Sequence, residues 1–394
     1  MVLQSYMQLK RSNQLWIVLV FIGVVCLLLR PTPTALSSIK ALWVTRFDYQ
    51  TDFDVKQIMR NAAMAGFTDV FFQVRGNGTT CYPSDIEPWS ESVLIKNHPP
   101  KLDLLSLAID QAHFRGMRLH AYINLLPGWS GEAPSTDSSQ LWNAHPDWFM
   151  VDQTGTPMQP VKGWYTFLNP LHPEVKMHLR KLYEEITTYP IDGIPFDYIR
   201  HPYDYYLVAT NQQDGLSLQE RKERYATFTH DAYSRARLKE ADLSLRELER
   251  QEKLRKNAIS ELLYSITKEN RANRGYVLSA ATLGNPKEAI RLAGQDLQHW
   301  IGQGLLDWVV QMNYSSTYFD DHLSSMKHLL KRKQRGHWVV GLSAENSESV
   351  LKHQLDAVRS SGAAGVSIFS YGLLFKDHEP TQIGRALISW LASY

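Results

Sequence analysis

The chain has 394 residues, of which 44% are hydrophobic and 21% are charged, a composition typical of a soluble globular protein with a sizeable core. Its formal net charge of +2 is too small to indicate a nucleic acid or another strongly charged partner. The sequence contains no Walker loop, HExxH, GxGxxG or CxxC motif, so nothing supports a nucleotide, zinc or redox site. We therefore predict no cofactor and no metal.

Residues 1–37 are predicted to be a targeting segment. Lys10 and Arg11 precede an apolar run over residues 15–29, which has the length of a signal peptide and is short for a membrane span. An uncleaved membrane anchor is the alternative, and it would keep the two basic residues in the cytoplasm. Either interpretation places residues 38–394, the predicted barrel domain, outside the cytoplasm in the periplasm or cell envelope.

Eight short apolar runs, each followed by a helical pattern, make up most of the remaining chain. Alternating strands and helices predict a parallel sheet, and eight such units predict a (β/α)8 TIM barrel. The predicted strands are 39–46, 69–75, 117–124, 191–197, 276–281, 306–313, 337–342 and 363–370. The predicted helices are 54–65, 103–115, 173–188, 216–270 (with a break), 286–302, 321–333, 347–360 and 381–392.

One long excursion, over residues 202–275, separates the fourth and fifth predicted strands. Its central part, residues 220–255, is dense in Arg, Lys and Glu and has few apolar side chains. This pattern predicts a long charged helical insertion whose solvated surface carries ion pairs four residues apart. A docking arm for an envelope partner or an anionic membrane surface is the alternative.

The run over residues 191–202 is the most informative stretch of the chain. Alternation along the fourth strand puts Gly193, Pro195 and Asp197 on one face. A carboxylate that closes an otherwise apolar strand costs free energy unless it is paired or has a function, and barrel enzymes carry their chemistry where strands end. We therefore predict that Asp197 is catalytic. An ordinary ion pair with Arg200 is the structural alternative.

Polar side chains also follow the other predicted strands, and tryptophans occur in the loops after the second and third strands. Such a rim suits a ligand rich in hydroxyls and amides, and flat aromatic rings suit the apolar faces of sugars. For His120, the alternative to a role in the site is a structural one, in which its ring is hydrogen-bonded within the protein. The predicted substrate-binding residues are Arg46, Asp48, Gln73, Arg75, His120, Asn124, Trp129, Arg200, Asn313, Tyr314 and Tyr371.

Hydrolysis of a glycosidic bond normally takes two carboxyl groups. Asp197 has three weak candidate partners, Asp48, Glu87 and Glu345. For the proton donor the candidates are Glu345 after the seventh strand and Glu87 after the second, and the sequence does not choose between them. If Asp197 is the nucleophile, Arg200 and Arg75 are expected to keep it ionised. A substrate-assisted mechanism, with a sugar N-acetyl group as nucleophile, would need fewer protein carboxylates.

Several blocks of the chain stand out together: ALWVTRFD from Ala41, FFQVR from Phe71, HAYIN from His120, DGIPFDYIRHP from Asp192 and DWVVQMNY from Asp307. With these blocks, the chain from about Ala41 to the C-terminus resembles the bacterial glycosyl-hydrolase-like family 10. That family includes a division-site glycosyl hydrolase that acts on peptide-free peptidoglycan. One departure is Pro195, where the family often has a histidine.

The resemblance implies a (β/α)8 glycosidase-type barrel that lies outside the cytoplasm and cleaves a bacterial glycan. The site residues that it implies are Arg46, Gln73, Arg75, His120, Asn124, Asp197, Arg200 and Tyr314. We thus predict a glycoside hydrolase whose substrate is peptide-free peptidoglycan or an exopolysaccharide, and whose only membrane contact is an uncleaved N-terminus. The alternative function is a catalytically inactive glycan-binding envelope protein.

Overall fold

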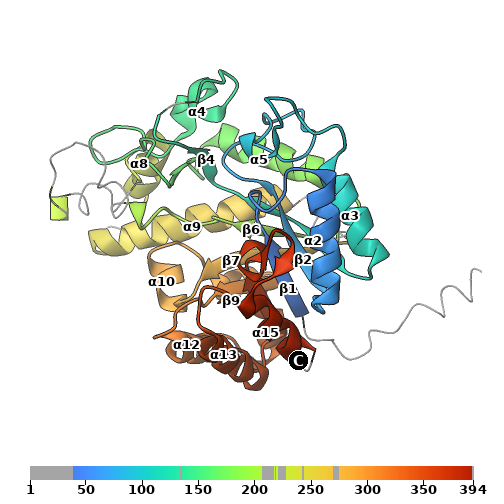
Figure 1. Cartoon of the computed structure of the whole chain (residues 1–394). Helices are drawn as coiled ribbons and strands as arrows, with labels where there is room; N and C mark the ends of the chain where they lie inside the picture. Colours follow the sequence, from blue (N-terminus) through green and yellow to red (C-terminus); the bar gives the residue numbers. More distant parts are fainter. Residues whose placement is uncertain are drawn as a thin grey trace, which may run out of the picture. The chain divides into compact units, whose positions relative to one another are not determined.

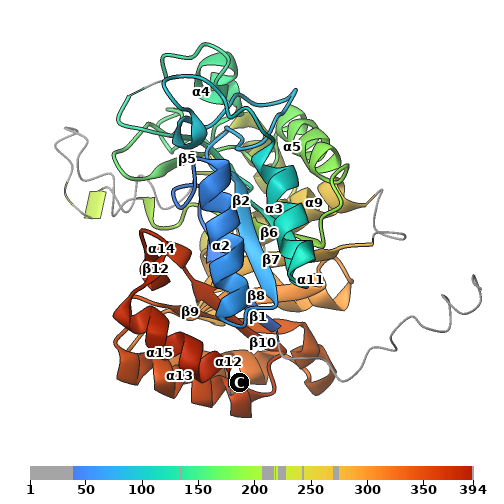
Figure 2. The same cartoon turned by 45° about the vertical axis from the view of Figure 1, so that its right-hand side comes forward.

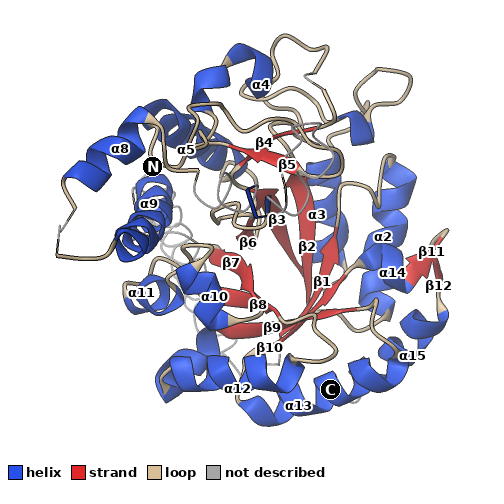
Figure 3. Cartoon of the chain, turned by 90° about the vertical axis from the view of Figure 1, so that its left-hand side faces the viewer, coloured by secondary structure: helices blue, strands red, loops and turns tan. Residues whose placement is uncertain are grey.

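A computed structural model describes residues 39–133, 135–205, 217, 219–220, 228–241, 244–268 and 275–392. In these residues eight parallel strands form a closed barrel in the order β1-β10-β9-β8-β7-β6-β3-β2, surrounded by helices (Figures 1 and 3). The predicted (β/α)8 fold is therefore confirmed. The predicted targeting segment, residues 1–37, lies outside the described residues and stays a prediction.

All eight predicted strands are present, most of them shifted by only one or two residues at an end. The barrel strands are β1 (Ile39–Val44), β2 (Asp69–Arg75), β3 (Arg118–Asn124), β6 (Gly193–Asp197), β7 (Val277–Leu283), β8 (Trp308–Met312), β9 (Trp338–Ser343) and β10 (Gly365–Phe369). The first strand ends at Val44 because the chain turns there: Asp48 N donates to Thr45 O at 3.0 Å. Arg46 therefore lies in a loop at the barrel mouth.

The helices that follow the strands cover the outside of the barrel, and Figure 2 shows α2 and α3 beside β2. They are α2 (Asp52–Met64), α3 (Leu104–Phe114), α5 (Pro173–Ile186), α9 (Glu247–Thr267), α10 (Pro286–Arg291), α11 (Leu297–Gly302), α12 (Phe319–Leu329), α13 (Glu348–Ser361) and α15 (Gln382–Leu391). Residues 286–302, predicted as one helix, form two. The chain turns between them at Gly294, whose φ of +74° is a left-handed conformation that ends a helix.

Helix α2 illustrates why these segments form where the sequence predicts them. Thr51 caps its first turn, and Thr51 and Asp54 bond to each other's backbone N–H in a capping box. The side chains of Val55, Ile58 and Met59 are fully buried, which is the spacing of one helical face. That apolar face packs on the barrel and leaves the polar face in water.

The segment between β6 and β7 contains α8 (Ala232–Lys239) and α9 in the part that the structure describes. At the start of α9, within the stretch predicted to be charged and solvated, exposed Arg246 forms an ion pair with Glu249, three residues along. The second half of α9 is a covering helix of the barrel: α9 packs against α5, and Ile259, Leu262 and Leu263 are fully buried. Much of residues 206–227 lies outside the described residues, so the nature of the insertion as a whole stays a prediction.

A short antiparallel hairpin that the sequence analysis did not predict follows β3. It consists of β4 (Pro127–Ser130) and β5 (Tyr165–Phe167) and carries Trp129 and Tyr165 at the ends of β2 and β3 (Figure 3). The remaining short elements are η1 (Glu91–Val93), α4 (Leu141–Ala144), η2 (Pro146–Trp148), η4 (Arg332–His337), α14 (Tyr371–Leu374), β11 (Phe375–Lys376) and β12 (Glu379–Pro380). Among the described helices, none is long and apolar enough to cross a membrane.

Gly193, the first residue of β6, lies where the packed barrel leaves no room for a larger side chain. A Cβ atom there would lie 2.1 Å from His120 Nδ1 and 2.8 Å from the Val277 carbonyl oxygen. Because both neighbours are inside the barrel, Gly193→Ala is expected to lower the free energy of unfolding by about 1–3 kcal/mol. Gly302→Ala is the control, since nothing lies within 4 Å of its added methyl group. Urea denaturation of both variants checks this, and an unchanged Gly193→Ala midpoint would contradict it.

Candidate active site

Asp197 closes β6 at the C-terminal end of the barrel, where the fold predicts chemistry. In the sheet it is in register with Asn124 of β3, and only 8% of its surface is exposed to solvent. Tyr198 leaves the strand with a φ of +51°, and its N–H donates to Asp197 Oδ1 at 2.7 Å. Arg200 Nη1 lies 3.3 Å from the same oxygen. The turn after β6 therefore holds one carboxyl oxygen with two donors.

Burial is the largest influence on the pKa of Asp197. Removal from water raises the pKa of this carboxyl, and the charge of Arg200, the Tyr198 N–H and the Tyr122 hydroxyl lower it only in part, so the net pKa is raised. Arg200 thus favours the ionised form, as expected, but does not outweigh burial, and Arg75 is instead paired with Glu87. A raised pKa is the shift that suits a proton donor.

Tyrosines surround Asp197. Tyr122 is buried, and its pKa is raised well above the usual range by burial and then by the charge of Asp197. The rings of Tyr165 and Tyr198 meet edge to face at 4.8 Å, and Arg200 Cζ lies 4.1 Å from the Tyr198 ring centroid. Tyr122, Tyr165 and Tyr198 were not among the predicted substrate-binding residues. No motif marks Tyr165, because a hairpin brings it to the mouth.

Arg46 and Asn124, both predicted to bind substrate, lie beside these tyrosines. Arg46 Nη1 donates to the Tyr165 hydroxyl at 3.3 Å, and Asn124 Nδ2 donates to the same oxygen at 3.5 Å. Asn124 Oδ1 is buried and has no hydrogen-bond partner in the described structure. Gln73 lies behind them, where its Oε1 accepts from the Arg46 backbone N–H at 2.9 Å. Gln73 thus positions Arg46 and is itself buried.

A groove of about 520 Å³ opens at the barrel mouth next to Arg46. Phe47, Trp89 and Trp129 contribute aromatic rings to its walls, and Phe47 is 73% exposed. Aromatic faces in a polar groove suit the apolar face of a sugar ring. Other loop tryptophans pack instead: Trp142 lies edge to face on Phe149.

Asp48 and Tyr371 line a second cavity, of about 390 Å³, on the other side of Phe47. Asp48 Oδ2 accepts hydrogen bonds from the backbone and side chain of Thr45, and burial raises the pKa of this carboxyl. The Tyr371 hydroxyl accepts from Asn61 Nδ2 at 3.0 Å. These two predicted residues therefore lie next to the groove and make none of the direct contacts to Asp197.

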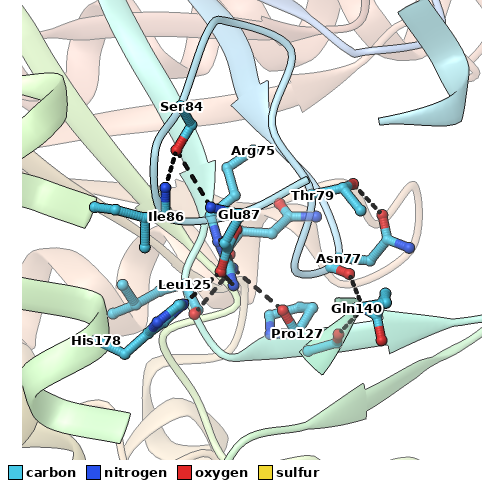
Figure 4. Close-up of polar contacts among 12 residues, drawn as sticks. Arg75, Asn77, Thr79, Ser84, Ile86, Glu87, Leu125, Pro127, Gln140 and His178 are labelled. Carbon is cyan, nitrogen blue, oxygen red and sulfur yellow. Dashed lines mark hydrogen bonds and ion pairs between the residues drawn. The ribbon is translucent and has the colours of Figure 1, made fainter. Parts of the chain in front are cut away.

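The structure contradicts the predicted roles of Glu87 and Arg75. The two side chains are completely buried and form a two-pronged ion pair, with Nη2–Oε1 and Nε–Oε2 distances of 2.7 and 2.8 Å (Figure 4). His178 Nε2 lies 2.8 Å from Glu87 Oε1. Burial alone would raise the pKa of Glu87, but Arg75 and His178 outweigh it and lower the pKa to about 2. A carboxyl with a low pKa that is closed to solvent is not a proton donor to a glycan.

His120 and Asn313 are also structural rather than substrate-binding. His120 is near the start of β3, at the opposite end of the strand from Asn124, and its Nε2 lies 2.7 Å from Asp69 Oδ1 inside the barrel. Asn313 is buried, and its Nδ2 donates to the Phe319 carbonyl oxygen at 2.9 Å. These contacts give both side chains a structural role, and His120 Nδ1 is buried with no hydrogen-bond partner in the described residues.

Glu345 remains as the second predicted carboxylate. It is exposed and follows β9. Tyr314 connects it to the centre of the site: burial raises the pKa of the Tyr314 hydroxyl, and the charges of Asp197 and Glu345 raise it further. The hydroxyl therefore lies within electrostatic range of both carboxyl groups, in agreement with Tyr314 and Glu345 belonging to one mouth.

The sequence analysis missed a further carboxyl, Asp204. Its Oδ1 is buried and has no hydrogen-bond partner in the described structure. Burial raises its pKa, and the charge of Arg200 opposes the rise. Asp204 and Asp197 thus share the charge of Arg200. Elsewhere in the described chain, no three His, Cys, Asp or Glu side chains converge in a way that could hold a metal ion.

Residues 38–346 match the family described as glycosyl hydrolase-like 10. The chain belongs to this family. Two of its relatives are glycosyl hydrolase DigH of Escherichia coli (strain K12), 35% identical over 144 residues, and glycosyl hydrolase YngK of Bacillus subtilis (strain 168), 23% identical over 287 residues.

The match with DigH covers 34% of this chain and 30% of DigH. The match with YngK covers 67% of this chain and 49% of YngK. The chain thus spans less than half the length of either relative. Among solved structures, the catalytic domain of β-amylase from Paenibacillus polymyxa has a TM-score of 0.57 at 12% identity, over 91% of this chain and 99% of that one. The α-galactosidase AgaB of Geobacillus stearothermophilus has a TM-score of 0.51 at 13% identity, over 91% and 41%. At such identities the likeness concerns the fold.

The buried ion pair predicts how the barrel responds to loss of its carboxylate. Glu87→Gln leaves the Arg75 guanidinium buried without a counter-ion, so the free energy of unfolding should fall by about 3–5 kcal/mol. Glu91→Gln is the matched control, because Glu91 is exposed, and it should change stability by less than about 0.5 kcal/mol. Urea denaturation at neutral pH measures both. Equal midpoints for the two variants would contradict a stabilising role for the pair.

The same pair predicts an acid limb of stability. The pKa of Glu87 falls from an ordinary 4.5 in the unfolded chain to about 2 in the fold. Its stabilising contribution is therefore complete above pH 4.5 and is lost as the pH falls toward 2. The wild type should lose its advantage over Glu87→Gln across this interval. Denaturation at a series of pH values checks this, and a constant difference would argue against it.

Proposed function

We propose that this protein is an extracytoplasmic glycoside hydrolase that cleaves a bacterial glycan, with peptide-free peptidoglycan and exopolysaccharides as its candidate substrates. The observation that carries the proposal is Asp197: a buried carboxyl with a raised pKa at the C-terminal end of the barrel. It is in register with Asn124, whose amide shares the Tyr165 hydroxyl with Arg46 of the aromatic groove. Membership of the glycosyl hydrolase-like 10 family supports the reaction class.

In the proposed reaction, Asp197 is the proton donor. It protonates the glycosidic oxygen while the bond from that oxygen to the anomeric carbon breaks. Glu345 is the second carboxyl group and removes a proton from the water that adds to the anomeric carbon. Arg200 and the Tyr198 N–H hold Asp197 in place, and Trp89 and Trp129 carry neighbouring sugar rings. The glycan takes up one water for each bond cleaved.

The location outside the cytoplasm is inferred from residues 1–37, whose basic start and apolar run are typical of a signal peptide or short anchor. Deletion of this segment should leave the protein in the cytoplasmic fraction. Fractionation of cells that express the full chain, with mass measurement of the product, distinguishes a cleaved signal from an anchor. Recovery of the full chain from the cytoplasm alone would contradict the proposed location.

Substitution of Asp197 tests the reaction. Wild type and Asp197→Asn, both as the full chain, are incubated with peptide-free peptidoglycan and a panel of exopolysaccharides, and released oligosaccharides are measured by mass spectrometry. Asp197→Asn removes the proton donor and should slow release by about 100- to 10,000-fold. Asp110→Asn, an exposed position on α3, makes the same chemical change away from the mouth and should retain wild-type activity.

The outcomes separate the candidate functions. Equal release by wild type and Asp197→Asn would rule out a role for this carboxyl. Binding without any release, unchanged in Asp197→Asn, would favour the inactive glycan-binding protein that the sequence leaves as the alternative.

A pH profile tests the assignment of Asp197 as the donor. A donor must be protonated, so activity should fall as the pH rises through the raised pKa of Asp197. The charge of Arg200 lowers that pKa, and Arg200→Gln should therefore move the basic limb to higher pH by about one unit, together with a lower maximal rate. A basic limb that stays in place while the acid limb moves would mean that Asp197 works in its ionised form.

A further inference from the structure

Arg46 differs from the other arginines at the barrel mouth because it has no carboxylate partner. Arg75 is paired with Glu87 and Arg200 with Asp197. Within the described residues, the guanidinium of Arg46 makes one hydrogen bond, to the Tyr165 hydroxyl, and no ion pair. The residue is only 6% exposed. A nearly buried charge without a counter-ion is costly to the fold and is normally compensated by a partner or a ligand.

The guanidinium faces the groove, which is where a ligand could supply that counter-ion. Arg46 lines the groove together with the rings of Trp89 and Trp129, and its Cζ lies 4.4 Å from the Phe47 ring centroid. Two acidic residues, Glu91 and Asp137, line the same groove, but both are exposed. Water and salt screen them, and Asp137 accepts hydrogen bonds from Ser139.

The protein holds Arg46 ready for a planar partner. Its backbone N–H is bound by Gln73, and its guanidinium is close to the backbone at Gly76, where a Cβ would lie 2.6 Å from Arg46 Cζ. A guanidinium with unused N–H donors binds a carboxylate through two parallel hydrogen bonds, which a neutral hydroxyl cannot reproduce.

We propose that Arg46 makes the groove selective for a glycan that carries a carboxylate. The inference rests on the proposed function and names its substrate class. A sugar ring would lie against Trp129 or Trp89, with its carboxylate on Arg46. Two chemical groups meet this requirement: the lactyl ether acid of a muramic acid residue, and the acid of a uronic acid residue. The lactyl group carries a charge only where no peptide is attached, because a peptide converts the acid into an amide.

Binding measurements test the proposal with matched glycans. Oligosaccharides of peptide-free peptidoglycan and of a polyuronate are each used intact and after chemical reduction of the carboxyl groups to alcohols. The Asp197→Asn form of the full chain prevents turnover, and tryptophan fluorescence reports occupancy of the groove. Intact oligosaccharides of at least one kind should bind about 10- to 100-fold more tightly than their reduced forms. Preference within the first pair assigns the lactyl acid, and preference within the second assigns the uronic acid.

Variants of Arg46 identify the residue responsible. Arg46→Gln, added to Asp197→Asn, should remove the preference, whereas Arg46→Lys keeps the charge and should retain part of it. Arg385→Gln changes the net charge equally at an exposed position on α15 and should leave the preference intact. The Arg46 backbone bond to Gln73 does not involve the exchanged side chain, and thermal unfolding verifies that each variant is folded. Equal binding of intact and reduced glycans by the Asp197→Asn form, in which Arg46 is unchanged, would overturn the proposal.

Turnover by the wild type separates this inference from the proposed function. Cleavage of intact and reduced glycans at the same rate would overturn the role of Arg46 and leave the hydrolase in place. A carboxylate preference in binding that Arg46→Gln removes, without turnover by the wild type, would support the role of Arg46 and contradict hydrolysis.

Discussion

The buried ion pair between Arg75 and Glu87 is the interaction on which the site depends. Besides Glu87, the Arg75 guanidinium binds the carbonyl oxygens of Asn124, Leu125 and Pro127, which are the residues where β3 ends and the β4–β5 hairpin begins. Leu125 N in turn donates to the Asp197 carbonyl oxygen at 2.7 Å. One buried cation therefore binds the backbone where β3 ends, and Figure 4 shows it beside Glu87, Leu125 and Pro127. The Leu125–Asp197 bond then connects this stretch to the end of β6. The anion that neutralises it has no remaining capacity for catalysis.

Asp197 shows the opposite balance between burial and charge. Glu87 is held by a guanidinium with two contacts and by a histidine, and these outweigh burial. Asp197 has a single arginine contact, at 3.3 Å, and that arginine also interacts with Asp204. Burial therefore prevails and raises the pKa of Asp197. Two buried carboxyl groups at one end of the barrel thus have pKa values shifted in opposite directions, because the number and geometry of their cationic partners differ.

The three arginines near the groove also differ in whether a carboxylate is paired with them. Arg75 is paired with Glu87 and Arg200 with Asp197, whereas Arg46 lines the groove and forms no ion pair within the described residues. Gln73 is part of the same arrangement, because its side chain joins the Arg46 backbone to the Arg75 carbonyl oxygen. The structural residues at the mouth thus position those that are open to a ligand.

The amino-acid sequence by itself determined the barrel and showed which strand each candidate residue follows. This is possible because buried positions recur with a short period along strands and helices, so neighbouring residues are enough to reveal them. The prediction of Asp197 rested on that local pattern. Only the tertiary structure decided which polar residues are open to a substrate. Glu87 and His178 are 91 residues apart, and His120 and Asp69 are 51 apart, so no local pattern reveals that their side chains meet. Pairing and pKa depend on distances across the fold. Because of those distances, Arg46 and Asp197 remain candidates for contact with a substrate. The other predicted residues of this group make structural contacts instead: Arg75, Glu87, His120 and Asn313.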